Sequence, residues 1–135
     1  MKRTLVLRND IREIARLAAF IDDLAGEARL DAALAMSLNL ALEEAVTNVV
    51  MYAYPPGQPG KLELVAERGE GFLRFVITDA GKPFDPTAVP DVDVTLGVEE
   101  RPVGGLGVFL MRRIMDEIRY ARRGGQNVLI LLKKI

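Results

Sequence analysis

The sequence contains no cysteine and no histidine, and each absence excludes a kind of chemistry. Without cysteine there are no disulfides, no thiolate nucleophiles and no zinc–thiolate sites. Without histidine there is no imidazole base, no phosphohistidine and no access to the commonest metal ligand of proteins. Any chemistry must therefore use carboxylates, amides, hydroxyls, lysine, arginine or the backbone.

An excess of charge of one sign is also lacking. Lysine and arginine number 18 and aspartate and glutamate 19, for a net charge of −1. This balance argues against general binding to nucleic acid or to an anionic membrane. The apolar runs of the sequence, Val128 to Leu132 among them, are too short to span a bilayer. The first residues do not resemble a signal peptide. We expect a cytoplasmic protein that binds neither nucleic acid nor membrane.

The residues that are present predict one globular domain over 1–135. Half of them are hydrophobic and 27% are charged, as in folded soluble proteins. Hydrophobic periodicity predicts the order β-α-α-β-β-loop-α-β-β. Gly26 is expected to end the first helix, and the second is expected over 30–51. The apolar face of the third is expected to include Phe109, Leu110, Ile114 and Met115. The fold class is an α/β (α+β) two-layer sandwich, in which helices cover one face of a mixed, largely antiparallel sheet.

The stretch 80–104 has no sustained period. Prolines stand at 83, 86, 90 and 102, and two basic residues against five acidic ones give it a net charge of −3. A loop of this length inside a compact domain is usually a lid or a binding loop. We therefore interpret residues 80–104 as a lid. Its acidity means that any phosphate bound there needs Mg²⁺, helix N–H groups and Arg101 or Arg112 as counter-charge.

Two polar residues, Glu44 and Asn48, lie four apart on the second predicted helix, so their side chains share one face. A carboxylate and an amide oxygen on one face can position water, accept a proton or bind Mg²⁺. An ordinary solvated helix edge is the alternative.

Asp79 ends a predicted strand in which Leu73, Phe75 and Ile77 lie on the same face. A carboxylate in that apolar phase is costly unless something donates a hydrogen bond to it. A ligand amino group, a backbone group or a water could do so, or the strand could end one residue earlier. Gly81 permits close backbone approach.

A glycine cluster, Gly104, Gly105 and Gly107, opens the third predicted helix. Free N–H groups at a helix start favour phosphate. A glycine hinge for a mobile lid is an alternative that is compatible with phosphate binding.

Together these segments resemble three sequence boxes of the GHKL ATPase superfamily. The matching segments are Glu44 to Asn48, Asp79 to Asp85 and Gly104 to Gly107, in that order. The missing histidine and the short chain point to the branch of the anti-sigma-factor serine kinases, with a Bergerat-type ATP-binding fold. The resemblance implies that Glu44 is the general base and Asn48 the Mg²⁺ ligand. It implies that Asp79 and Gly81 bind adenine, and that Gly104, Gly105 and Gly107 are lid hinge and phosphate contacts.

The chain departs from that family at two places. Tyr52 stands where a histidine is common, and Gln126 and Asn127 follow the last glycine where a threonine is common. Either amide could replace the threonine near adenine.

The resemblance implies a function as well as a fold. The expected function is an ATP- and Mg²⁺-dependent serine kinase that binds a sigma factor and phosphorylates a serine of its antagonist protein, as a homodimer. The alternatives are a nucleotide-gated binding module without phosphotransfer and a switch kinase with a target outside sigma-factor pathways.

Overall fold

The computed structural model describes residues 1–90 and 105–135. Its five strands form one sheet in the order β1-β2-β3-β5-β4, and every neighbouring pair is antiparallel. The strands are β1 Lys2–Arg8, β2 Lys61–Gly69, β3 Phe72–Asp79, β4 Glu117–Arg123 and β5 Gln126–Lys134. The expected sheet is therefore present, and within the described residues it contains only antiparallel pairs.

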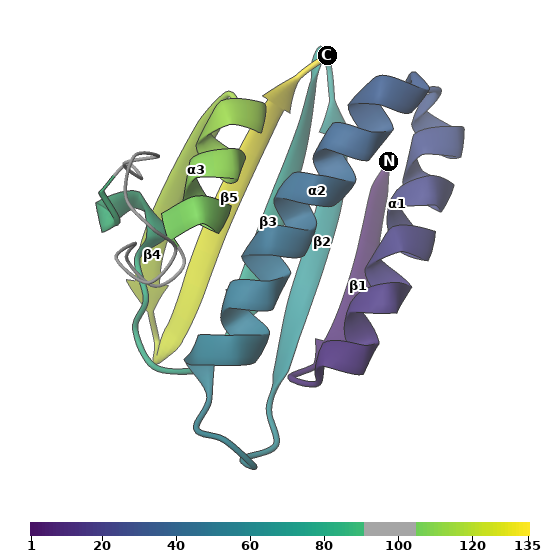
Figure 1. Ribbon diagram of the computed structural model, residues 1–135. Helices are drawn as coiled ribbons and strands as arrows, with labels where there is room; N and C mark the ends of the chain where they lie inside the picture. The colour runs from purple at the N-terminus through teal and green to yellow at the C-terminus, as the bar shows by residue number, and fades with distance from the viewer. Residues whose placement is uncertain (91–104) are drawn as a thin grey trace.

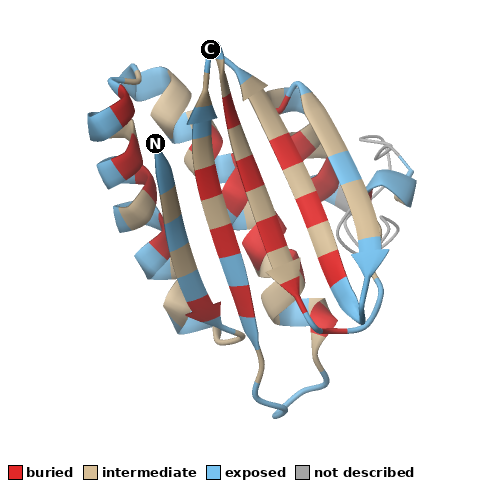
Figure 2. Cartoon of the chain, turned by 180° about the vertical axis from the view of Figure 1, so that it is seen from behind, coloured by how far each residue is buried: buried red, intermediate tan, exposed pale blue. Residues whose placement is uncertain are grey.

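Within residues 1–90 and 105–135, three α-helices are present, and they cover one face of the sheet (Figure 1). They are α1 Ala15–Ala28, α2 Ala32–Asn48 and α3 Gly105–Ile114. The short helical turn η1 Ile11–Ile14 precedes α1, η2 Val49–Ala53 follows α2, and η3 Pro86–Ala88 comes after β3. Buried and half-buried residues alternate along β3 and through the middle of β5 (Figure 2). Since alternate side chains lie on opposite faces of a sheet, the buried ones belong to the face that the helices cover. This arrangement is the two-layer α/β sandwich that the sequence predicts.

Local signals place the ends of several elements. The Asp31 side chain accepts a hydrogen bond from the Leu34 N–H and caps α2 at 2.7 Å. Gly124 and Gly125 take φ values of 56° and 77°, which the tight turn between β4 and β5 requires. The hairpin expected at the end of the chain is confirmed, and it sets Asn127 directly opposite Asp79 on β3.

Two expectations about helix ends were wrong. Helix α1 continues past Gly26 to Ala28 and ends at Arg29 in a left-handed conformation with φ 54°. The extension buries Ala28 in the core, which outweighs the weak helix propensity of glycine. Helix α2 ends at Asn48 instead of Met51, and a π-helical turn, η2, follows it. Such π turns are frequent at functional sites.

The expected loop 80–104 is described only in its first part. Residues 86–88 form the 3₁₀ turn η3, capped by the Asp85 side chain, which accepts from Thr87 N–H at 2.8 Å. The remainder, 91–104, lies outside the described residues. The apolar face of α3 was assigned correctly only in part. Met115, just after the helix, is buried as expected and Ile114 packs against the core, but Val108 and Met111 are the buried residues within α3, and Phe109 and Leu110 are half-buried.

Across residues 1–90 and 105–135, the helices are all too short or too polar to cross a bilayer.

Candidate functional site

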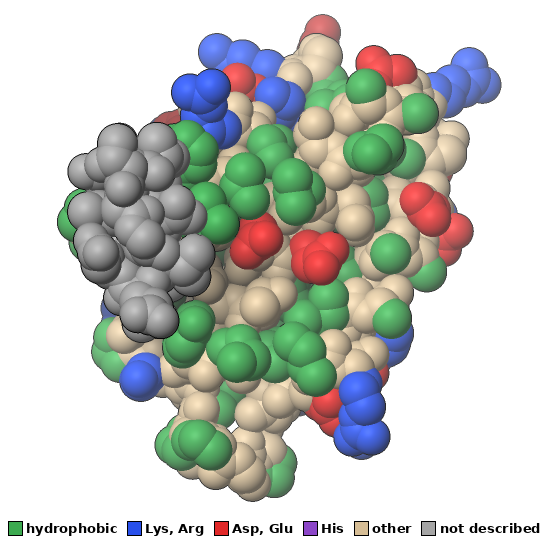
Figure 3. Space-filling model, viewed as in Figure 1, with side chains coloured by type: hydrophobic (Ala, Val, Ile, Leu, Met, Phe, Trp, Pro, Cys, Tyr) green, Lys and Arg blue, Asp and Glu red, His purple; other side chains and the backbone are tan. Residues whose placement is uncertain are grey.

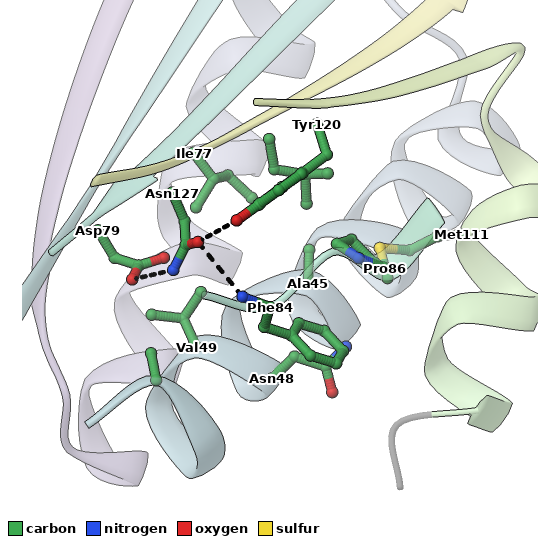
Figure 4. Close-up of a pocket in the computed structure, with 12 residues that line it drawn as sticks. Ala45, Asn48, Val49, Ile77, Asp79, Phe84, Pro86, Met111, Tyr120 and Asn127 are labelled. Carbon is green, nitrogen blue, oxygen red and sulfur yellow. Dashed lines mark hydrogen bonds between the residues drawn. The ribbon is translucent and has the colours of Figure 1, made fainter. Parts of the chain in front are cut away.

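A pocket opens between α2 and the sheet, at the end of the sheet where β3 finishes (Figure 4). Its walls are mainly apolar, with a few polar groups aimed inward, as in most small-molecule sites. The lining comes from α2 and η2, from β3, β4 and β5, from the segment after β3 and from α3. The residues are Ala45, Asn48, Val49, Ala53, Ile77, Asp79, Phe84, Pro86, Met111, Tyr120, Asn127 and Leu129.

Asp79 is the last residue of β3 and is only 5% exposed. Its Oδ1 atom accepts hydrogen bonds from the Gly81 N–H and from the Asn127 amide, both at 2.9 Å. The strand includes Asp79, so the alternative of an earlier strand end is wrong, and a backbone N–H is the expected donor that the structure shows. The other oxygen has no hydrogen-bond partner among the described residues and can accept a donor from the pocket.

Gly81 leaves no room for a side chain. A Cβ atom there would lie 2.3 Å from the carbonyl oxygen of Ala53 in the π turn η2. The same carbonyl accepts a hydrogen bond from the Lys82 N–H at 2.8 Å. Only glycine allows the backbone after Asp79 to dock so closely against the end of η2.

Asn48 is 8% exposed at the end of α2 and lines the pocket. Its Nδ2 atom is buried without a hydrogen-bond partner within the described residues. A buried amide that lacks a partner is rare in folded proteins. An NH₂ group that lacks a partner and faces a pocket can donate a hydrogen bond to an acceptor atom of a polar ligand.

Glu44 lies one helical turn before Asn48 and is half-buried. Burial, and then the neighbouring Glu43 carboxylate, raise the pKa of Glu44 above its usual value. Acidic side chains lie over α2 among hydrophobic ones on this face of the molecule (Figure 3). A raised pKa brings a carboxylate closer to the range of a proton acceptor at neutral pH.

The start of α3 approaches Glu44 at Gly107. A Cβ atom on Gly107 would lie 2.8 Å from Glu44 Oε2. Gly105 is the first residue of α3, and Gly104 lies outside the described residues. The structure therefore brings Glu44 and Gly107 together, about one turn of α2 from Asn48, while Asp79 lines the pocket and Gly81 lies next to it through its hydrogen bond with Asp79.

Two side chains of the site were only partly foreseen. Asn127 is 5% exposed and contacts Asp79, whereas Gln126 is exposed, so the choice that the sequence left open falls on Asn127. Tyr120, which donates a hydrogen bond to Asn127 Oδ1, was missed. The signal for Asn127 was its place in the buried phase of β5, with Leu129 and Leu131. No sequence signal indicates that Tyr120 on β4 reaches it.

Within residues 1–90 and 105–135, no group of three or more aspartate, glutamate, histidine or cysteine side chains could hold a metal ion.

Known proteins share this fold and sequence pattern. A model of the histidine kinase-like ATPase domain matches residues 7–133. The serine/threonine-protein kinase BtrW of Bordetella bronchiseptica is 31% identical over 112 residues, 83% of this chain and 79% of BtrW. The serine-protein kinase RsbW of Bacillus cereus is 32% identical over 97 residues, 69% of this chain and 60% of RsbW.

Among solved structures, the RsbU and RsbW domains of Rv1364c from Mycobacterium tuberculosis superpose with a TM-score of 0.70 at 18% identity. That match covers 99% of this chain and 32% of the mycobacterial one, and it shows the common fold. The resemblance drawn from the three sequence boxes is confirmed. Because the family model spans almost the whole chain, the chain belongs to the family of histidine kinase-like ATPase domains.

Proposed function

We propose that this chain is an ATP- and Mg²⁺-dependent serine protein kinase that acts as an anti-sigma factor. The observation that carries the proposal is that three groups from two distant parts of the sequence come together, two of them in the lining of one pocket and the third beside it. Within the described residues, these are a buried carboxylate on Asp79 with one unpartnered oxygen, a buried amide on Asn48 with an unpartnered nitrogen, and a carboxylate of raised pKa on Glu44 beside the start of α3. The kinase relatives BtrW and RsbW support the assignment.

Asp79 and Gly81 would hold the adenine base. The ionised carboxylate of Asp79 can accept hydrogen bonds but cannot donate one. It therefore suits the exocyclic amino group of adenine and repels the keto oxygen of guanine. The lining around it is apolar, including Ile77, Met111 and Leu129, and suits a flat aromatic ring. Gly81 would let the backbone pass close to the base.

Asn48 would be the protein ligand of Mg²⁺. Its side-chain oxygen is the hard donor that this ion prefers, and the ion usually completes its shell with water and substrate phosphates. This mode fits a site with no acidic cluster in the described residues. Gly104, Gly105 and Gly107 would face the phosphates, because the first N–H groups of α3 have no partner inside the helix.

Glu44 would be the general base. In phosphoryl transfer, bound ATP supplies the γ-phosphoryl group to the substrate hydroxyl. Glu44 would accept the proton of that serine hydroxyl, and its half-buried position beside Gly107 keeps it close to the phosphate end of the site. A residue needed only to bind adenine would not require a carboxylate here, which favours an enzyme over a nucleotide-gated binding module.

We further propose the partners that the family resemblance implies. The kinase would hold a sigma factor and phosphorylate a serine on its antagonist protein, as a homodimer in the cytoplasm, where both transcription factors and ATP are found. Residues 80–104 would form the lid over the phosphates. Lysine and arginine are balanced by acids along the chain, so nucleic acid and membrane are not proposed as partners.

Calorimetric titration with ADP tests the adenine site. Asp79→Asn should weaken ADP binding about tenfold to a hundredfold, because the amide offers a donor where the base needs an acceptor and loses a charge-assisted hydrogen bond. Asp22→Asn, which removes an exposed carboxylate from α1, is the matched control and should bind as the wild type does. Equal affinity of Asp79→Asn and wild type would remove Asp79 from the site.

A further inference from the structure

The Asn127 amide makes hydrogen bonds with every donor and acceptor that it has. Nδ2 donates to Asp79 Oδ1 at 2.9 Å and to the Lys82 carbonyl at 2.8 Å. Oδ1 accepts from the Tyr120 hydroxyl and, at 3.3 Å, from the Phe84 N–H. Figure 4 shows Asn127 between Asp79, Tyr120 and Phe84 at the edge of the pocket. One side chain thus joins β3, β4, β5 and the segment after β3.

These four contacts fix the orientation of the amide. Two of its partners, the carboxylate and the carbonyl, only accept hydrogen bonds, so they require the NH₂ group. The Phe84 N–H only donates, so it requires the amide oxygen. Turning the amide over would place like groups against each other at three contacts. No hydrogen-bonding capacity remains for a ligand, and Asn127 therefore acts through its neighbours.

We propose that Asn127 is a positioning residue that aims the Asp79 carboxylate at the exocyclic amino group of a bound adenine nucleotide, and that Tyr120 holds Asn127 in place. The inference rests on the proposed function. Asn127 and the Gly81 N–H both engage Oδ1 of Asp79. The second carboxylate oxygen is left for the base, and the carboxylate plane is fixed before the ligand arrives.

The hydroxyl of Tyr120 completes the arrangement from β4. Without it, one face of the Asn127 oxygen would lose its donor in a buried place, and the amide could tilt away from Asp79. The contacts of Asn127 with Lys82 and Phe84 also hold the backbone next to Gly81, where the base would lie. Selectivity for an amino-purine therefore depends on two residues that line the pocket but act by positioning Asp79 instead of by a hydrogen bond to the ligand.

The test compares two ligands that differ only in the amino group, ADP and purine riboside diphosphate. Calorimetric affinities are measured for wild type, Asn127→Ala, Tyr120→Phe and the control Gln126→Ala, an exposed neighbour on β5. We expect the preference of the wild type for ADP to fall about tenfold in Asn127→Ala and about threefold in Tyr120→Phe. Gln126→Ala should keep the preference of the wild type. In an Asp79→Asn background, Asn127→Ala should cause little further loss.

A role in folding alone would weaken both nucleotides equally, so an unchanged preference in Asn127→Ala overturns the inference while the proposed function stands. If wild type itself fails to bind ADP, the proposed function is wrong and the inference falls with it. If Asn127→Ala does not fold, Tyr120→Phe decides, since it removes only one oxygen. A reduced preference supports the positioning role, and an unchanged one overturns it.

Discussion

Folding changes the protonation of Glu44, a residue of the helical layer. Its pKa is raised in the folded state, so this state binds a proton more tightly than the unfolded chain does. Stability contributed by the protonated form is fully present below the unfolded pKa, about 4.3. It is lost as pH rises through the folded pKa. At neutral pH the ionised carboxylate therefore opposes folding.

Glu44→Gln should consequently be more stable than wild type at neutral pH, because the neutral amide avoids the cost of a half-buried charge beside Glu43. The difference in melting temperature should shrink as pH is lowered and close near pH 4, where the wild-type side chain is protonated too. Thermal unfolding at several pH values measures it.

The matched control for that series is Glu63→Gln, which removes an exposed carboxylate from β2. This control measures how much of the difference in melting temperature comes from the loss of any negative charge. If the difference in melting temperature between Glu44→Gln and wild type does not change with pH, the pKa of Glu44 is not raised by folding. The same variant should lose transfer of labelled phosphate from ATP and keep ADP affinity, since Glu44 does not line the base pocket.

Residue patterns predicted Asp79 well and Asn127 poorly, for a physical reason. The alternation of Leu73, Phe75 and Ile77 was enough to place Asp79 on the buried face. The role of Asn127 depends on partners from β3, β4 and the segment after β3, which only the folded sheet brings together. Sequence alone could narrow the choice to Gln126 or Asn127, and strand phase selects the second.

At the scale of elements, the packing of α3 on α2 was harder to predict than the existence of either helix. The third helix is apolar on most of its circumference, so several faces satisfy the helical period. The contact with α2 selects the face of Val108 and Met111. Strand alternation left no such freedom, and β3 begins and ends where the sequence predicts.

Because α3 approaches α2 closely at Gly107, a substitution there should lower the activity without lowering the stability. Alanine favours a helix over glycine by about 1 kcal/mol. Its methyl group would lie too close to the flexible end of the Glu44 side chain, 2.8 Å from Oε2, and at van der Waals distance, 3.4 Å, from Glu44 Cβ. Gly107→Ala should therefore fold at least as stably as wild type, but it should displace the Glu44 carboxylate. Transfer of labelled phosphate to a candidate antagonist protein should fall at least tenfold.

Gly81→Ala is the informative comparison for that variant. Its methyl group would meet backbone, the Ala53 carbonyl at 2.3 Å, which cannot move without displacing η2. It should lower both the melting temperature and the affinity for ADP. Normal phosphotransfer by Gly107→Ala would show that Glu44 does not depend on the space that Gly107 leaves.

At the scale of the whole molecule, the site depends on a strand order that the sequence order does not reveal. Strand β5 inserts between β3 and β4, which places Asn127 beside Asp79 across a separation of 48 residues. Local patterns predicted each strand and each hairpin, but not which strand would join the centre of the sheet. Burial accounts for this, because β2, β3 and β5 each carry a run of alternating buried residues, whereas β4 has none and takes the edge (Figure 2).

The pocket draws its lining from α2, η2, α3 and three strands, so a ligand in it should stabilise the domain as a whole. Binding to the folded state alone contributes about 2.7 kcal/mol at a ligand concentration of a hundred times Kd. For a domain of this size, ADP should then raise the melting temperature on the order of 10 °C. Thermal unfolding with and without ADP measures the shift.

Two variants make this shift specific to the proposed site. At the same ADP concentration, a tenfold to hundredfold loss of affinity in Asp79→Asn leaves only about 0.4–1.4 kcal/mol of stabilisation, so its shift should fall to half or less. Glu44→Gln should keep the full shift, because that side chain lies outside the base pocket. An identical shift in Asp79→Asn would mean that ADP stabilises the domain from another place, and the two carboxylates would then lose the separate roles proposed for them.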